Sequence, residues 1–224
     1  AWAEAGYNIA DEQFALTARP AWTAHTSNGG SLTISGNSVS GTDAEGNAYQ
    51  MAFDDSGKMT AWTYAGKQIL HTNANGTIAS GAAPDFNSCR NIDNDKESTG
   101  TANVACVNSS STKIIKALTK DDATGCATMS VQGNAKNCQY TIRYTFYPDA
   151  TVDMKTTFSP SGATRRLGLG LQLASGFENV EFYARGPRSN YSDRKTGSYL
   201  GRFTTTVDDM VEEQIHPQTY GDHE

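Results

Sequence analysis

Several short stretches of this chain alternate strictly between apolar and polar side chains, and this two-residue period is the feature that most restricts its fold. In residues 140–147, the apolar side chains of one face are Ile142, Tyr144 and Phe146. Because successive side chains of a strand point to opposite faces, this stretch predicts a strand with one buried face. Pro148-Asp149-Ala150 interrupts the pattern, which resumes over residues 151–158, so the two stretches together predict a β-hairpin.

The same alternation recurs elsewhere, whereas helical periodicity is nearly absent. The further strand-like segments are residues 32–34, 49–53, 61–64 and 112–118, and a leucine series at positions 167, 169, 171 and 173. They are separated by turns rich in Gly, Asp, Asn and Ser, and the chain contains 21 glycines. About ten short strands with such turns predict an all-β fold, with an antiparallel β-sandwich as its architecture.

Charge and hydropathy exclude two classes of partner. The formal net charge is −6, and no part of the sequence forms a run of Lys and Arg. Because nucleic-acid binders carry basic stripes that neutralise phosphates, we expect no nucleic-acid partner. The longest apolar runs are only a few residues, far below the roughly 20 that a membrane-spanning helix needs, so we expect no membrane partner.

Four cysteines, Cys89, Cys106, Cys126 and Cys138, form no C-x-x-C pair of the kind found in zinc or redox sites. Their spacing predicts two local disulfides, although three pairings are possible. Cys126 with Cys138 would enclose an expected turn at residues 132–134, and Cys89 with Cys106 would close an irregular segment. Disulfides persist in oxidising compartments, which predicts a periplasmic or secreted protein. The alternative is four buried free thiols.

Several stretches combine residues in ways that composition does not explain. In the longest, the notable positions are Tyr183, Arg185, Gly186, Pro187, Asn190, Tyr191, Asp193, Arg194, Gly201, Phe203, Val207, Met210, Pro217, Gln218 and Gly221. Others run from Trp2 to Leu16, from Phe53 to Trp62, and from Pro84 through Phe86 and Arg90 to Asp93-Asn94-Asp95. Together they resemble the last large domain of the β-galactosidases of glycoside hydrolase family 2, over nearly the whole chain.

The resemblance implies a particular form of the sandwich. In that family, the domain is a two-sheet supersandwich similar to galactose mutarotases. Residues 1–20 match the strand and linker that close a preceding immunoglobulin-like domain, and residues 21–224 match the N-terminal portion of the sandwich. The family's sandwich continues beyond the P-Q-x-x-G motif, so the domain is expected to be truncated at its C-terminal side. Exposed strand edges then predict a homodimer of the fragment.

The resemblance also implies a function. The parent enzyme is expected to hydrolyse terminal β-D-galactosides with retention, using two glutamates of a (β/α)₈ barrel domain. Because nothing in the sequence shows the alternating strands and helices of a barrel, this chain is expected to hold no catalytic residue. Its expected role is to buttress the barrel and shape the rim of the active site. No cofactor is expected in this chain, since the Mg²⁺ and Na⁺ of relatives bind other domains. Its partners are those domains and, through the parent, the galactoside substrate.

Two groups of residues are candidates for the rim or for the contact with other domains. In the first, Arg90, Asp93, Asn94 and Asp95, the resemblance implies a loop that faces the barrel. The Asp-Asn-Asp triplet lacks the spacing of an EF-hand calcium loop, and the favoured interpretation is that its side chains satisfy backbone donors in a turn. The second group is either a clamp for a sugar or a set of groups that hold a long connection together. Its members are Arg185, Asn190, Tyr191, Asp193 and Arg194.

Two other functions remain open from the sequence. The sandwich could act alone as a carbohydrate-binding module, with Trp2, Trp22 or Trp62 as a stacking platform. It could also carry a mutarotase-like epimerase activity, which requires a histidine acid and a carboxylate base near the sugar ring. The four histidines show no metal-binding spacing, and no local pattern selects such a pair.

Overall fold

The chain is all-β in a computed structural model that describes residues 4–7, 12–18, 20–21, 23–88, 110–136, 138–162, 167–188 and 197–210. Within these residues every strand pair is antiparallel, and the segment η2 (Asp208–Met210) is a 3-10 turn. The chain divides into two compact units. One comprises His25–Ser175, and the other comprises Ala1–Ala24 together with Gly176–Glu224.

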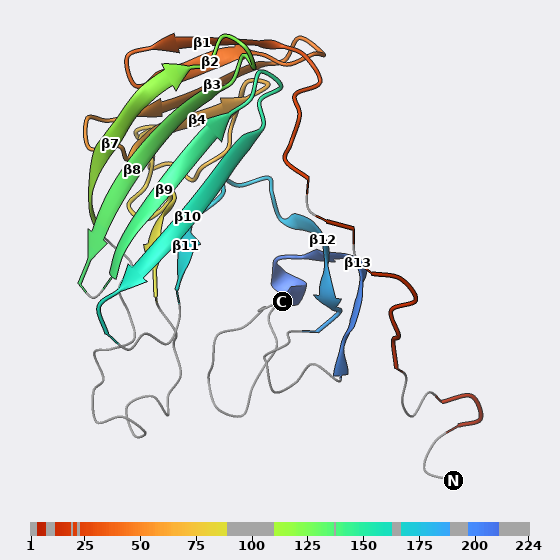
Figure 1. Cartoon of the computed structure of the whole chain (residues 1–224). Helices are drawn as coiled ribbons and strands as arrows, with labels where there is room; N and C mark the ends of the chain where they lie inside the picture. The colour runs from red at the N-terminus through yellow and green to blue at the C-terminus, as the bar shows by residue number, and fades with distance from the viewer. Residues whose placement is uncertain are drawn as a thin grey trace. The chain divides into compact units, whose positions relative to one another are not determined.

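The first sheet of the larger unit is a meander of five consecutive strands (Figure 1). They are β1 (Ser31–Ser35), β2 (Ser38–Thr42), β3 (Ala48–Phe53), β4 (Met59–Tyr64) and β5 (Lys67–Gln68). The β3–β4 turn shows why the sequence folds this way, because the Asp54 side chain accepts hydrogen bonds from the backbone N–H groups of Ser56 at 2.9 Å and Lys58 at 3.0 Å. Gly57 follows in the left-handed region, at a φ of 83°, where glycine carries no steric penalty.

The second sheet contains four strands in the order β10-β9-β8-β7. These are β7 (Ser111–Lys120), β8 (Ala127–Ala135), β9 (Cys138–Phe146) and β10 (Val152–Pro160). In β9, buried residues alternate with partly or fully exposed ones along the whole strand. Strand β10 pairs with β9 from Val152 opposite Phe146 to Pro160 opposite Cys138. The hairpin predicted from the alternation is therefore confirmed.

The core of the larger unit lies between these two sheets, which stack face to face (Figure 1). The ring of Phe53 from the first sheet lies edge-on to Tyr144 of the second, with centroids 5.2 Å apart, and to Phe146 at 5.9 Å. Met51 and Ile142 add fully buried aliphatic surface. Each such side chain stabilises the fold by about 1.5–3 kcal/mol through burial. Two antiparallel sheets with an apolar core between them make a β-sandwich, as the sequence predicted.

The leucine series at residues 167–173 was expected to form one strand, and this expectation is wrong. Only β11 (Gly168–Gly170) forms there, paired with β6 (Asp85–Asn87). Only the central part of residues 167–173 pairs with a neighbouring strand there, and Leu171 and Leu173 are 39% and 47% exposed. Beyond Gly170, the backbone bonds to the loop near Leu70 instead, where Leu173 forms an isolated bridge. The backbone hydrogen bonds of the segment are thus divided among β6, the loop near Leu70 and the Ala82 carbonyl, so the alternating leucines do not form one continuous strand.

The smaller unit contains a hairpin of β12 (Asn179–Gly186) and β13 (Tyr199–Thr206). Phe182 and Phe203 lie opposite each other in the register, with ring centroids 5.3 Å apart. Gln13 is far away in the sequence, but its side-chain amide forms the pair of hydrogen bonds that the backbone of a neighbouring strand would form. It donates to the Leu200 carbonyl at 2.9 Å and accepts from the Leu200 N–H at 2.7 Å.

The expected disulfide between Cys126 and Cys138 is absent, because both are free thiols. The expected turn at residues 132–134 does not form either, since β8 continues through them to Ala135. Cys126 therefore precedes the start of β8 while Cys138 lies opposite its last residue, Ala135. At about 3.3 Å per residue, the length of β8 separates the two sulfurs far beyond bonding distance. Cys89 and Cys106 lie outside the described residues.

Gly133 explains why residues 132–134 resemble a turn but form a strand. An ideal Cβ at this position would lie 2.1 Å from Cζ of Tyr140 on the neighbouring strand. Only glycine leaves room for that ring across the β8–β9 pair, which is a known reason for glycine inside strands. Gly133 therefore allows the Tyr140 side chain to lie directly against the backbone of β8.

Candidate functional site

Most residues proposed from the sequence for the rim lie outside the described part of the chain. They are Arg90, Asp93, Asn94, Asp95, Asn190, Tyr191, Asp193 and Arg194. The described structure does contain Arg185 and the residues on either side of both proposed segments. It shows how the ends of these segments are fixed.

Arg185 lies near the end of β12, where the connection to β13 begins. Its Nη1 donates to the carbonyl oxygen of Ser198, the residue just before β13, at 3.2 Å. The bond therefore joins the two ends of the connection that carries the second group of candidate residues. Gly186, next to Arg185, is buried and lies against Phe203, because an ideal Cβ there would be 2.8 Å from its ring.

The first segment, residues 89–109, is bracketed by a hydrogen-bond network around Asp85. Its Oδ1 accepts from the Tyr140 hydroxyl at 2.5 Å, the Ser110 hydroxyl at 2.7 Å and the Phe86 N–H at 2.7 Å. Lys58 Nζ lies 3.8 Å from Oδ2 of the same carboxylate. We call Asp85, Ser110 and Tyr140 the Asp85 network.

The network joins three separate parts of the fold. Asp85 begins β6, Tyr140 lies within β9, and Ser110 directly follows the segment at the start of β7. The ring of Tyr140 is 1% exposed and stacks on Phe86 with centroids 5.5 Å apart. Both ends of residues 89–109 are thereby attached to the sandwich core.

The electrostatics keep the phenol of Tyr140 in its donor form. Burial raises the pKa of this hydroxyl strongly, and its bond to the Asp85 carboxylate raises it further. The phenol consequently stays protonated across the physiological range and donates to the carboxylate. A hydrogen bond to a charged acceptor contributes more than a neutral one, about 1.5–3 kcal/mol. The alternation in the sequence predicts the strand that holds Tyr140 but not this bond, because the bond joins residues 55 positions apart.

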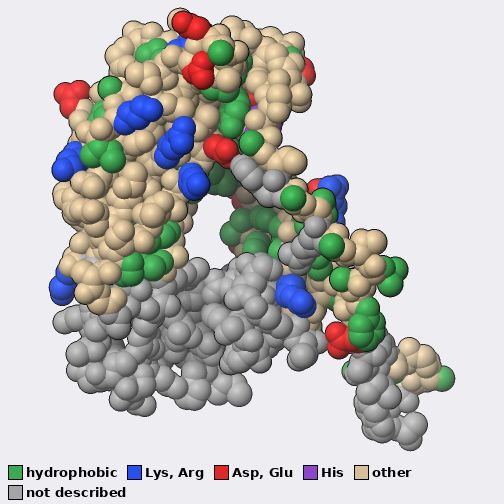
Figure 2. Space-filling view, in the orientation of Figure 1, with side chains coloured by type: hydrophobic (Ala, Val, Ile, Leu, Met, Phe, Trp, Pro, Cys, Tyr) green, Lys and Arg blue, Asp and Glu red, His purple; other side chains and the backbone are tan. Residues whose placement is uncertain are grey.

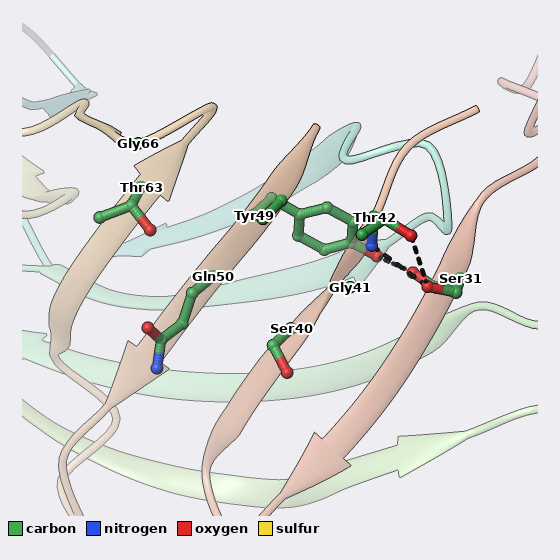
Figure 3. Close-up of a pocket in the computed structure, with 9 residues that line it drawn as sticks. Ser31, Ser40, Gly41, Thr42, Tyr49, Gln50, Thr63 and Gly66 are labelled. Atoms are coloured by element: carbon green, nitrogen blue, oxygen red, sulfur yellow. Dashed lines mark hydrogen bonds between the residues drawn. The ribbon is translucent and has the colours of Figure 1, made fainter. Parts of the chain in front are cut away.

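A shallow polar groove lies on the outer face of the first sheet (Figure 3). Its lining residues are Ser31, Ser40, Gly41, Thr42, Ala48, Tyr49, Gln50, Thr63 and Gly66. Hydroxyl and amide groups therefore line it, whereas the only aromatic ring among them, Tyr49, is 3% exposed. The groove offers hydrogen bonds but no open ring on which a sugar could stack.

The Tyr49 hydroxyl is part of the framework under this groove. It donates to the Ser31 carbonyl at 2.8 Å, and burial together with the charge of Asp149 raises its pKa to about 12. Gly41 is required beside it, since an ideal Cβ would lie 1.8 Å from the Ser31 carbonyl oxygen. The only signal in the sequence for the groove is the row of Ser and Thr at alternate positions of residues 31–42.

Among the described residues, no three His, Cys, Asp or Glu side chains gather in a way that could hold a metal ion. No helix in that part of the chain has the length and apolarity needed to cross a bilayer.

Comparison with known proteins gives consistent matches. One protein family, described as "Beta galactosidase small chain", matches residues 45–224. A β-galactosidase of Priestia megaterium is 28% identical over 231 aligned positions, which cover 99% of this chain and 21% of that protein. β-Galactosidases of Staphylococcus xylosus and Halalkalibacterium halodurans are 40% and 33% identical over 44% and 36% of the chain. These two matches cover 9% and 8% of the relatives. The chain thus spans about a fifth of the Priestia protein.

Proposed function

This chain belongs to the β-galactosidase small-chain family, and we propose that it is a non-catalytic domain of a glycoside hydrolase family 2 enzyme that hydrolyses terminal β-D-galactosides. The observation that carries the proposal is the alignment of nearly the whole chain with 21% of the Priestia megaterium β-galactosidase. Retaining hydrolysis needs an acid and a nucleophile about 5–5.5 Å apart. We assign both to the part of the parent enzyme that lies outside this alignment, together with the Mg²⁺ and Na⁺ sites.

The role we assign to the domain is to hold two connections at the mouth of the parent's active site. A rigid sandwich is suited to this, since binding residues commonly lie on loops fixed by a scaffold. The Asp85 network fixes the ends of residues 89–109, which include Arg90, Asp93, Asn94 and Asp95. The bond from Arg185 to Ser198 does the same for the connection with Asn190, Tyr191, Asp193 and Arg194.

The compartment and assembly of the parent are part of the same proposal. We propose a periplasmic or secreted location. Because Cys126 and Cys138 are free thiols, this proposal depends on a disulfide between Cys89 and Cys106. Homodimerisation of the chain is part of the proposal. Sedimentation at two protein concentrations would test it.

The rim role is tested by kinetics of the parent β-galactosidase with a chromogenic galactoside. We expect Arg90→Ala and Asp93→Asn to raise KM with a smaller effect on kcat, because rim residues bind substrate and transition state alike. Lys67→Ala, in β5 of the same domain, serves as the control and should leave both constants unchanged. If both rim variants kept the parental KM and kcat, the role assigned to residues 89–109 would be wrong.

A further inference from the structure

The outer face of the second sheet carries four exposed cations, although the chain as a whole has a formal net charge of −6. They are Lys113, Lys116, Arg143 and Lys155, from β7, β9 and β10. Figure 2 shows Lys and Arg side chains gathered over this sheet. We call these four residues the basic face.

The strand register arranges three of these cations in one line. Lys155 lies opposite Arg143, Arg143 lies opposite Ser130 of β8, and Ser130 lies opposite Lys116. Neighbouring strands are about 4.8 Å apart, so this row crosses the whole sheet with cations on three of its four strands. Like charges directly opposite each other destabilise a sheet. The repulsion between these cations therefore lowers the stability of the isolated domain, and a bound anionic ligand would reduce that repulsion.

The described part of the chain provides no ion-pair partner for these four cations. The ion pairs found there are His25–Asp149, Lys58–Asp85 and Arg202–Glu181. Asp153 of β10 is the acidic residue nearest the row in register, but it lies opposite Thr145, and its Oδ2 accepts from the Tyr147 hydroxyl at 3.5 Å.

The other outward side chains define what the face can recognise. On β8, β9 and β10 most of them are hydroxyls and amides, namely Thr128, Ser130, Gln132, Asn134, Gln139, Thr141, Thr145, Thr157 and Ser159. Asp153 adds one carboxylate on β10, and β7 exposes Ile115 beside Lys116. No aromatic side chain lies among these positions. Single-stranded nucleic acid binds by stacking its bases on aromatic rings, so this face lacks its main requirement. Duplex DNA has one charge per roughly 1.7 Å and would meet strong repulsion from the otherwise acidic chain.

The outer faces of the two sheets differ in their charged side chains. On the first sheet, the corresponding outward positions of β1, β2 and β3 hold Ser, Thr, Gln and Ala and no charged side chain. A cationic outer face is therefore specific to the second sheet.

We propose that the basic face binds a linear carboxylated polysaccharide. Its sparse carboxylates would pair with the cations, and its hydroxyls would bond to the neighbouring Thr, Ser and Gln side chains. Arg143 presents a planar fork that matches a carboxylate with two parallel hydrogen bonds.

The test is calorimetric titration of the 224-residue chain with polygalacturonate at low ionic strength. Arg143→Gln combined with Lys155→Gln should weaken binding by about tenfold and flatten its salt dependence, because two charge contacts are lost. Lys67→Gln changes the net charge on the other sheet and is the matched control, expected to keep the affinity within about twofold. Because the substituted pair is mutually repulsive, the double variant should melt no lower than the parent chain.

Three results would overturn the proposal. Undetectable binding of polygalacturonate by the unmodified chain is the first. An equal loss of affinity in Lys67→Gln is the second, since it would show that net charge alone governs binding. The third is tighter binding of duplex DNA, lost in the same double variant, which would assign the face to a nucleic-acid partner.

Discussion

Removing the Tyr140 hydroxyl tests the Asp85 network with the smallest possible change. Tyr140→Phe keeps the ring that fills the space above Gly133 and stacks on Phe86, and deletes the hydroxyl that donates to Asp85 and also bonds to the Ser110 hydroxyl. A hydrogen bond to a charged acceptor contributes about 1.5–3 kcal/mol. Because the Ser110 hydroxyl and the Phe86 N–H still donate to the same oxygen, the carboxylate keeps two partners. We therefore expect a loss of about 2 kcal/mol, in the lower part of that range.

The assay is thermal and urea unfolding of the 224-residue chain. For a chain of this size, about 2 kcal/mol corresponds to a fall in Tm of roughly 4–8 °C. The matched control is Tyr144→Phe, because Tyr144 is equally buried at 1% exposure and its hydroxyl makes no hydrogen bond to any described residue. This variant should stay within about 0.5 kcal/mol of the parent. Equal losses in the two variants would refute a special contribution from the Asp85 network.

Three further predictions follow from the described packing and charges. Gly133→Ala should cost about 3 kcal/mol or more, because its Cβ would overlap the phenol ring across the strand pair; Gly162→Ala, with no atom within 4 Å, should change urea stability little. Burial raises the pKa of Asp149, but hydrogen bonds from a histidine and two backbone N–H groups outweigh it and lower the pKa overall. The carboxylate's stabilisation is therefore complete above about pH 4 and lost as the pH falls, so Asp149→Asn should destabilise the chain at pH 7 and flatten its acid unfolding curve; an unchanged curve would contradict this. Cys126, partly exposed, should react with a thiol reagent in the native state, whereas buried Cys138 should react only after unfolding, as mass spectrometry would show; a Cys126–Cys138 disulfide in the native protein would contradict the structure.

The sequence predicted the parts of the fold that depend on local pattern. The β9–β10 hairpin follows from alternation on both sides of Pro148-Asp149-Ala150, and each strand's buried face follows from its own residues. Such features need no knowledge of distant contacts, since the two-residue period determines which side chains share a face.

The errors arose where a distant contact decides the local structure. Gly133 has the composition of a turn, but the ring of Tyr140 requires glycine inside a strand. The leucines at 167–173 alternate, but the backbone of this segment bonds to several separate parts of the chain. The expected Cys126–Cys138 disulfide depended on a turn at residues 132–134. Because β8 continues through these residues, the two cysteines lie far apart and are free.

The candidate site shows the same limit. Arg185 was recognised from its motif, but its partner, the Ser198 carbonyl, is a backbone atom that no side-chain pattern marks. The basic face draws Lys116, Arg143 and Lys155 from separate strands, so no basic run exists in the sequence. Only the sheet register brings these charges into one row.

The central proposal is that bond cleavage is performed elsewhere in the parent enzyme and that the domain by itself is inactive. Incubation of the purified 224-residue chain with a chromogenic β-galactoside measures this directly, with the parent β-galactosidase as positive control. We expect release of the chromophore no faster than in buffer. Release that rises in proportion to the concentration of the chain, and that co-elutes with it in size-exclusion chromatography, would contradict the account.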